Sequence, residues 1–139
     1  MSTTSVITVA ATVNAPISKV WETWTEPQHI TQWNAAADTW HCPSAANDLR
    51  KGGKFTSRME AKDGSFGFDF GGIYDEVLPH KLISYTLDDG RKVDITFTVV
   101  GDITHVTESF VAENENPIEM QQGGWQAILD NYKKYTENL

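Results

Sequence analysis

The chain has 139 residues and a mass of 15.5 kDa, the size of one domain that can bury a core without metals or disulfides. Hydrophobic residues make up 40% and charged residues 22%, a balance that excludes a disordered chain. The net charge of -8 and the pI near 4.8 argue against a nucleic-acid partner, because proteins that bind nucleic acid carry a basic surface.

Nothing in the sequence indicates secretion or membrane insertion. The single cysteine, Cys42, cannot form an internal disulfide. The N-terminal segment lacks the positive charge and apolar run of a signal peptide, and no segment has the length and hydropathy of a membrane span. We therefore expect a cytoplasmic protein with no stable membrane insertion, folded as one domain over residues 1–139, with residues 1–4 as a flexible tail.

The N-terminal pattern predicts one strand and two short helices. Residues 5–14 carry apolar side chains at period two, which is typical of a strand with one buried face. Pro16 suits the first turn of a helix over residues 16–24, and Asn14 is a nearby candidate cap. Pro27 starts a second helix, and the proline between them favours an angled pair over a single rod.

Residues from Trp40 to Ala112 indicate five or six antiparallel strands, because the connections are too short for parallel crossovers. Phe66, Phe68 and Phe70 alternate with small or polar residues, which predicts a strongly curved strand with one packed face. The turns are expected at Gly52-Gly53, Asp63-Gly64, Asp89-Gly90 and Gly101-Asp102.

The hydrophobic period changes from two to that of a helix near the C-terminus. Asn116, Pro117 and Glu119 have the pattern of a cap, a first-turn proline and a capping-box carboxylate. Gly123-Gly124 interrupts the helix, and because each glycine costs about 1 kcal/mol there, we expect a bend or the close approach of a backbone or ligand. The apolar stripe consists of Trp125, Ile128, Leu129, Tyr132 and Leu139.

These elements predict an α+β fold, in which a curved antiparallel sheet wraps around one long C-terminal helix. A curved sheet cannot touch a straight helix along its whole length. We therefore expect a cavity where the two diverge.

The chain also resembles a known family. The segments that carry the resemblance are Pro16-Ile-Ser-Lys-Val-Trp and Trp24-Thr-Glu-Pro of the first helix pair, Asp48-Leu-Arg-Lys-Gly-Gly-Lys-Phe of a glycine turn, and the C-terminal helix from Asn116-Pro-Ile-Glu onward. In this order they resemble segments of the bacterial family named after the activator of the heat-shock-chaperone ATPase. This family belongs to the SRPBCC superfamily, with START lipid-transfer domains, birch-pollen-allergen-like proteins and polyketide cyclases. The resemblance implies a helix-grip fold closing a hydrophobic cavity, and links to a chaperone partner and to stress response.

Aromatic residues are the main functional signal, with 5 Trp, 4 Tyr and 6 Phe in a small chain. A ring set of this size suits a pocket for an apolar or aromatic small molecule. The competing interpretation is that the rings only fill the core. The candidate ligand-binding residues are Trp21, Trp24, Trp33, Trp40, His41, Phe55, Phe66, Phe68, Phe70, Tyr85, Phe97, Glu108, Trp125 and Leu129.

Two polar features need separate interpretation. Glu108 shares a face with apolar neighbours and is expected near Tyr85; a carboxyl group in such a pocket has a raised pKa and suits acid–base chemistry. The alternative interpretation is that Glu108 is the one polar group in an apolar wall and takes no part in chemistry.

Arg58 and Asp69 are expected to pair across a hairpin at the surface, and the alternative is that Arg58 anchors a ligand carboxylate.

We expect no metal and no cofactor. The four histidines share no ligand spacing, and the sequence contains no phosphate loop, dinucleotide fingerprint or G-x-S-x-G motif. The predicted function is the binding of an apolar, aromatic or lipid-like small molecule between sheet and helix. A cyclase-like or hydrolase-like enzyme that uses sparse polar cavity residues is one alternative, and a homodimeric or chaperone-associated interaction module is the other.

Overall fold

The computed structural model describes residues 5–139, so the tail predicted for residues 1–4 lies outside the described residues. Strand β1 (Val6–Val13) leads into helices α1 (Ile17–Thr25) and α2 (Pro27–Trp33), and α3 (Ile118–Glu137) ends the chain. Between α2 and α3 lie β2 (Trp40–Asn47), β3 (Lys54–Ala61), β4 (Gly67–Leu78), β5 (Leu82–Leu87), β6 (Lys92–Val100) and β7 (Ile103–Val111).

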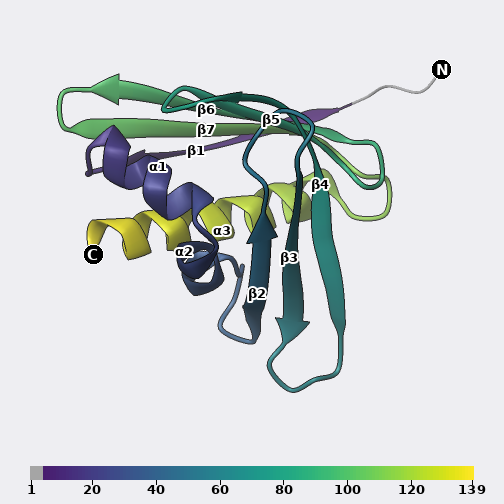
Figure 1. Ribbon diagram of the computed structural model, residues 1–139. Coiled ribbons are helices and arrows are strands. Elements are labelled where there is room, and N and C mark those ends of the chain that lie inside the picture. Colours follow the sequence, from purple (N-terminus) through teal and green to yellow (C-terminus); the bar gives the residue numbers. More distant parts are fainter. Residues whose placement is uncertain (1–4) are drawn as a thin grey trace.

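The strands form one antiparallel sheet that curls around α3, which confirms the predicted fold class (Figure 1). Its seven strands follow the order β1-β7-β6-β5-β4-β3-β2, so the first strand pairs with the last and the rest are neighbouring hairpins. In Figure 1 the strands β1, β5, β6 and β7 lie across the top of the molecule, whereas β2, β3 and β4 turn downward past the middle of α3.

The bend in the sheet is located in β4. The pairing of β4 with β5 shifts between Tyr74 and Glu76, which is a bulge that increases local twist. Just before it, a side chain at Gly72 would clash with the carbonyl of Thr86 on β5, so only glycine allows this close approach. The predicted curvature is therefore confirmed.

The prediction that all three phenylalanines of this segment share a packed face is wrong. Phe70 lies partly buried under α3, but Phe66 is 62% exposed and Phe68 is 43% exposed. The outer end of the β3–β4 hairpin projects beyond the helices in Figure 1. These two rings contact Trp40 instead, at ring-centroid distances of 5.9 and 6.0 Å.

Rings seal the space beneath the C-terminal half of α3. Tyr132 is fully buried there and its hydroxyl donates a hydrogen bond to the Val20 carbonyl, 2.6 Å away. Trp24 and Trp33 meet the Tyr132 ring edge-on, with centroids 4.7 and 4.9 Å away. This contact ties both short helices to α3 and fills the space beneath the C-terminal half of the helix.

The helix ends differ from the sequence expectation. Pro16 and Pro117 occupy the N-cap positions of α1 and α3, and no side-chain cap bond forms at either, so the roles predicted for Asn14 and Asn116 are wrong. The Gly123-Gly124 pair lies inside a continuous helix, and an added Cβ at either position would meet nothing within 4 Å. Our expectation of a close approach by another backbone segment there is therefore also wrong.

Candidate ligand-binding site

A cavity of about 360 Å³ lies between the curled sheet and the N-terminal half of α3. It forms where strands β3 and β4 turn away from the helix, which is the divergence that the sequence predicted. Ligand pockets in proteins are usually at least about this large. Its lining residues are Ile30, Trp33, Asn34, Phe55, Ser57, Met59, Phe68, Phe70, Tyr85, Arg91, Glu108, Glu113, Asn116, Gln121, Trp125 and Ile128.

Aromatic rings from three elements form the cavity wall. On the sheet side, Phe55 of β3 lies 6.2 Å from Phe70 of β4 and 4.6 Å from Tyr85 of β5, measured between ring centroids. On the helix side, Trp125 lies 6.0 Å from Phe70 and stacks on Phe110 at 3.9 Å. Because Phe110 is buried, this stacking holds the Trp125 indole in place without a ligand. The aromatic wall is therefore preformed.

Glu108 is the carboxyl group of the cavity. It lies on β7, where its cross-strand partners are Val9 on β1 and Ile95 on β6, both almost fully buried. Its own side chain is 6% exposed and makes no hydrogen bond within residues 5–139, yet none of its atoms is sealed off, so the carboxyl oxygens face the cavity. Burial raises the pKa of this carboxyl to about 8.

Tyr85 presents a second unpaired oxygen to the same space. Burial raises the pKa of its hydroxyl well above the usual value, and the nearby charge of Glu108 raises it further, so the phenol stays neutral. Its hydroxyl makes no hydrogen bond to any described residue, although it lines the cavity. Two oxygens from neighbouring parts of the sheet are therefore available to a ligand.

The only cation on the lining is already engaged. Among the described lining residues, Arg91 alone carries a positive charge, and its Nε donates to Asp89 at 2.8 Å. Its Nη1 donates to the Val111 carbonyl at 3.2 Å. The guanidinium therefore closes the β5–β6 turn against β7 and does not pair with Glu108.

The rim is held by Gln121 on the first turns of α3. Its Oε1 accepts a hydrogen bond from the Glu113 amide at 2.9 Å, and its Nε2 donates to the carbonyls of Glu113 and Asn116. Gln121 therefore fixes the chain at the start of α3, a role that we had expected a capping box to fill. It positions the β7–α3 loop at one end of the cavity.

The comparisons with known proteins agree with this architecture. The family model described as activator of Hsp90 ATPase homolog 1-like protein matches residues 14–137. The chain belongs to this family. No curated protein matches the sequence significantly. Within residues 5–139, no helix has the length and hydropathy to cross a membrane.

Solved structures of the family have the same fold. The solution structure of an AHSA1-like protein from Aeromonas hydrophila is 42% identical over 96% of this chain and 93% of its own, with a TM-score of 0.90. A solution structure from Cytophaga hutchinsonii is 58% identical over 95% of this chain and 92% of its own, with a TM-score of 0.83. A Chromobacterium violaceum crystal structure, 23% identical over 96% and 98% of the two chains, has a TM-score of 0.86 and supports the fold alone.

The structure brings part of the predicted set together in this cavity and places the rest elsewhere. The candidates that line it are Trp33, Phe55, Phe68, Phe70, Tyr85, Glu108 and Trp125. Trp24, Phe97 and Leu129 are buried in the core, and Trp21 is partly buried against it beside Phe97. These four lie toward the sealed half of α3, where sheet and helix are in contact.

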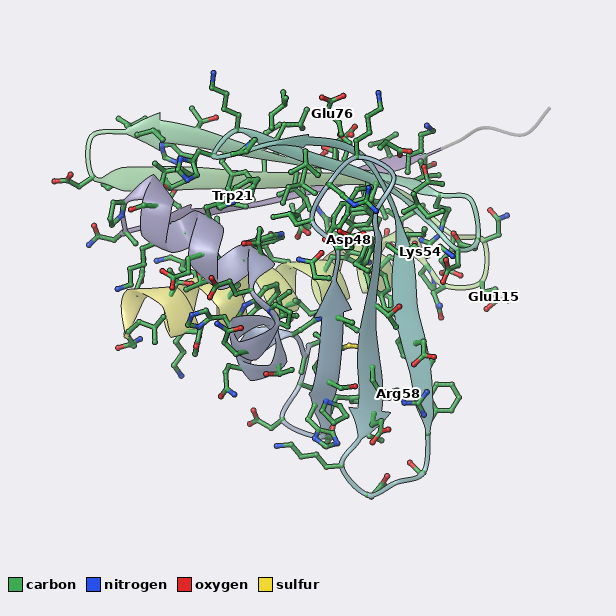
Figure 2. All side chains as sticks on the ribbon, in the orientation of Figure 1. Trp21, Asp48, Lys54, Arg58, Glu76 and Glu115 are labelled. Atoms are coloured by element: carbon green, nitrogen blue, oxygen red, sulfur yellow. The ribbon has the colours of Figure 1, made fainter. Side chains whose placement is uncertain are left out.

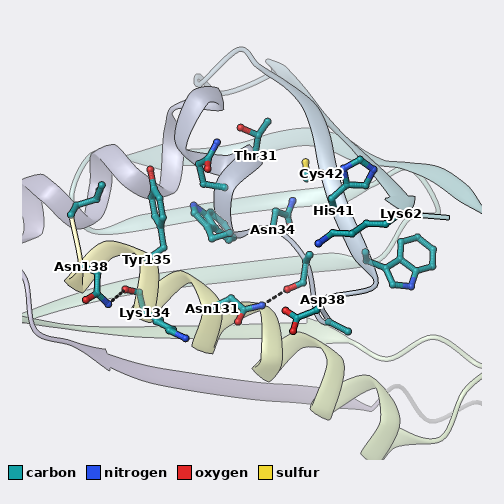
Figure 3. Close-up of a pocket in the computed structure, with 16 residues that line it drawn as sticks. Thr31, Asn34, Asp38, His41, Cys42, Lys62, Asn131, Lys134, Tyr135 and Asn138 are labelled. Atoms are coloured by element: carbon teal, nitrogen blue, oxygen red, sulfur yellow. Dashed lines mark hydrogen bonds between the residues drawn. The ribbon is translucent and has the colours of Figure 1, made fainter. Parts of the chain in front are cut away.

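A second hollow of about 540 Å³ takes two other candidates, Trp40 and His41 (Figure 3). It lies between α2, the start of β2 and the C-terminal half of α3, and its labelled side chains include His41, Lys62 and Asn131. More than half of its lining residues have polar side chains and many are exposed, so it is a depression in the outer surface. Phe66, the last candidate, lines neither hollow.

Arg58 pairs as expected across the β3–β4 hairpin. Its Nη1 lies 3.3 Å from Asp69, and its Nε donates to Glu60 at 2.9 Å. Figure 2 shows Arg58 at the outer end of the hairpin, away from α3. The alternative in which this arginine anchors a ligand carboxylate is therefore wrong for this cavity.

One group of possible metal ligands lies at the junction of α1 and α2. His29 Nε2 is 3.9 Å from carboxylate oxygens of both Glu22 and Glu26, and its Nδ1 is bonded to the Tyr135 hydroxyl at 2.7 Å. The sequence reasoning missed this group because the residues come from two helices whose angle is a tertiary property. Gln28 already bonds the Glu26 carboxylate, and no further feature of the site points to a metal ion.

Several cavity residues were not on the predicted list. Ile128 belongs to the apolar stripe predicted for the C-terminal helix, and Ile30 lies one helical turn before the candidate Trp33. Ser57 and Met59 lie on the same face of β3 as Phe55, so the period of the strand could have identified them. No local signal marks Gln121, whose role depends on the position of the β7–α3 loop.

Proposed function

We propose that this protein binds an apolar or aromatic small molecule in the cavity between its sheet and α3. The observation that carries the proposal is the preformed aromatic wall around an empty space of about 360 Å³, which lies between the N-terminal half of α3 and strands β3 and β4. A core without a ligand function would be close-packed there, because each void costs stabilising contacts.

The lining fits a ligand with an apolar body and one polar group. Phe55, Phe70 and Trp125 offer ring faces and edges, and the polar atoms gather at Tyr85 and Glu108. Such a wall with a few placed polar groups is the usual composition of small-molecule sites.

A fill-in variant tests this proposal. Ser57 is 6% exposed and lines the cavity, so Ser57→Leu places a larger apolar side chain in the space that the ligand would occupy. Thr56→Leu is the matched control, because the adjacent residue on the same strand is exposed on the other face of the sheet. The probes are two neutral compounds, 2-naphthalenemethanol and 1-decanol, titrated while amide and indole NMR signals are recorded.

We expect saturable shifts at Phe70, Tyr85 and Trp125 in the parent protein and in Thr56→Leu. In Ser57→Leu, affinity should fall by about tenfold or more, because an added side chain removes space that the cavity cannot regain. Absence of saturation by either probe in the parent protein, or equal binding by both variants, would contradict the proposal.

An acid–base enzyme is the second candidate, and Glu108 is the observation that favours it. A carboxyl group with a pKa of about 8 beside a neutral phenol is suited to proton transfer near neutral pH. Binding ranks first because Ser57, the one serine among the described lining residues, makes no hydrogen bond to Glu108 or Tyr85 that would activate it as a nucleophile. Turnover of a bound ligand, lost in Glu108→Gln while binding persists, would establish the enzyme instead.

The interaction module remains a further alternative, supported by one surface feature. Trp40, Phe66 and Phe68 contact one another at the outer end of the β3–β4 hairpin, where two of the rings are largely exposed. Exposed apolar clusters often mark contact surfaces. Nothing in the structure identifies what would cover this cluster.

A further inference from the structure

We propose that the ligand of this cavity carries a basic nitrogen, which enters as an ammonium group and pairs with Glu108. This inference rests on the proposed binding function and adds the chemical class of the ligand. It depends on one geometric fact: a nearly fully buried carboxyl group faces the cavity without a hydrogen-bond partner among residues 5–139.

A carboxyl group in this position is costly to the folded protein. The side chains across from it on β1 and β6 are Val9 and Ile95, which offer no hydrogen bond. A buried polar group without a partner costs free energy that an apolar residue of similar size would not. A ligand that supplies the missing partner would recover that free energy as binding affinity.

An ammonium group suits the free oxygens of the cavity. It is a donor only, and Glu108 and the hydroxyl of Tyr85 are both able to accept a hydrogen bond. Charge-assisted bonds to a carboxylate are among the stronger hydrogen bonds in proteins. Phe55, Phe70 and Trp125 line the same space, and aromatic rings attract cations.

The charges of the molecule favour a cation over an anion. The net charge of -8 attracts cations toward the surface. An anionic ligand would need Arg91, but this guanidinium is already bonded to Asp89 and to the Val111 carbonyl. Of the charged residues on the lining, Glu108 is the one that remains without a partner, because Glu113 accepts bonds from the amides of Glu115 and Asn116.

The pairing predicts proton release on binding. The protonated carboxyl of Glu108 must give its proton to solvent before it can pair with an ammonium group, so affinity should rise with pH up to about 8. The other groups that face it do not change charge in this range: Tyr85 has a raised pKa, Glu113 has a lowered pKa, and Arg91 is permanently charged. The lining residues from α2, β3, β4 and α3 carry no charge.

Three probes of one shape test the inference by calorimetry: 2-naphthylmethylamine, 2-naphthalenemethanol and 2-naphthoic acid. In the parent protein at pH 8 we expect the amine to bind about tenfold to a hundredfold tighter than the alcohol, and the acid to bind weakest. The preference for the amine should shrink by about tenfold per pH unit between pH 7 and 6, while the affinity of the alcohol stays constant.

Two variants locate the effect. Glu108→Gln should bring the amine and alcohol to equal affinity at every pH while the alcohol still binds, which shows that the cavity is intact. Glu113→Gln removes the same charge from the rim, where both carboxylate oxygens already accept bonds, and should keep the preference for the amine.

The outcomes separate the inference from the proposed function. If the alcohol binds but the amine is no tighter, or if the acid binds best, the ligand class is wrong and the binding function stands. Equal loss of the amine preference in both variants would show a general charge effect and would also overturn the role of Glu108. If no probe binds the parent protein, the proposed function itself fails.

Discussion

Replacing Glu108 should change how the stability of the ligand-free protein depends on pH. The structure raises the pKa of this carboxyl from about 4.5 to about 8 by burial. The folded protein therefore holds a proton between these values that the unfolded chain releases. Stability is greatest below the unfolded pKa and falls as the pH rises toward the folded pKa, because ionised Glu108 is tolerated only in the unfolded state.

The size of the effect follows from the two pKa values. At about 1.4 kcal/mol per tenfold change in acidity, the full cost of ionising Glu108 in the folded protein is roughly 5 kcal/mol. Most of this cost appears between pH 5 and pH 9, where the parent protein should lose roughly 4 kcal/mol of unfolding free energy through this one group. Glu108→Gln has the same shape and no titration, so it should lack this loss.

The assay is urea denaturation of both proteins at pH 5, 6, 7, 8 and 9, followed by tryptophan fluorescence. The quantity of interest is the difference in unfolding free energy between variant and parent, since other titrating groups contribute equally to both. The unfolding free energy of the variant should increase steadily relative to that of the parent protein as the pH rises. A difference that stays within about 0.5 kcal/mol across the range would refute the idea that this carboxyl is buried in an apolar cavity.

Two further substitutions test the packing of α3 by the same denaturation assay. Tyr132→Phe removes the hydroxyl that donates to the Val20 carbonyl, 2.6 Å away. Because both groups are buried, the unfolding free energy should fall by about 1–2 kcal/mol. An unchanged unfolding free energy would mean that this hydrogen bond does not stabilise the packing of α3. Gly123→Ala should stabilise the protein by about 0.5–1 kcal/mol, because the new methyl group meets nothing and the unfolded chain loses freedom. Destabilisation by this alanine would indicate that the glycine pair is needed for a bend or a close contact after all.

The sequence was sufficient for the order and type of the elements. Apolar residues at period two marked β1, which was expected over residues 5–14 and runs from Val6 to Val13, and the change to a helical period marked α3. The turn residues Asp63-Gly64 and Asp89-Gly90 fall between paired strands, with positive φ at both glycines. These signals are local, because periodicity and backbone freedom are properties of short segments.

The composition of the site was only partly predictable. The rings were visible as a set, but a ring on an apolar face has the same sequence signature whether it packs against a helix or borders a void. Trp24 and Phe70 illustrate this: the first is in the sealed core and the second lines the cavity. Glu108 stood out because a carboxyl group interrupted an apolar face, and that signal is independent of the helix position.

What the sequence determined by itself is therefore the set of elements, the curled sheet with its gripping helix, and the one anomalous carboxyl group. Only the tertiary structure decided where the helix and sheet separate, which depends on the bulge beside Tyr74, the close contact at Gly72 and the seal around Tyr132. The physical reason is that a cavity is defined by atoms that do not meet. The position of such a gap depends on the relative placement of distant segments, whereas the local pattern of each segment is the same with or without it.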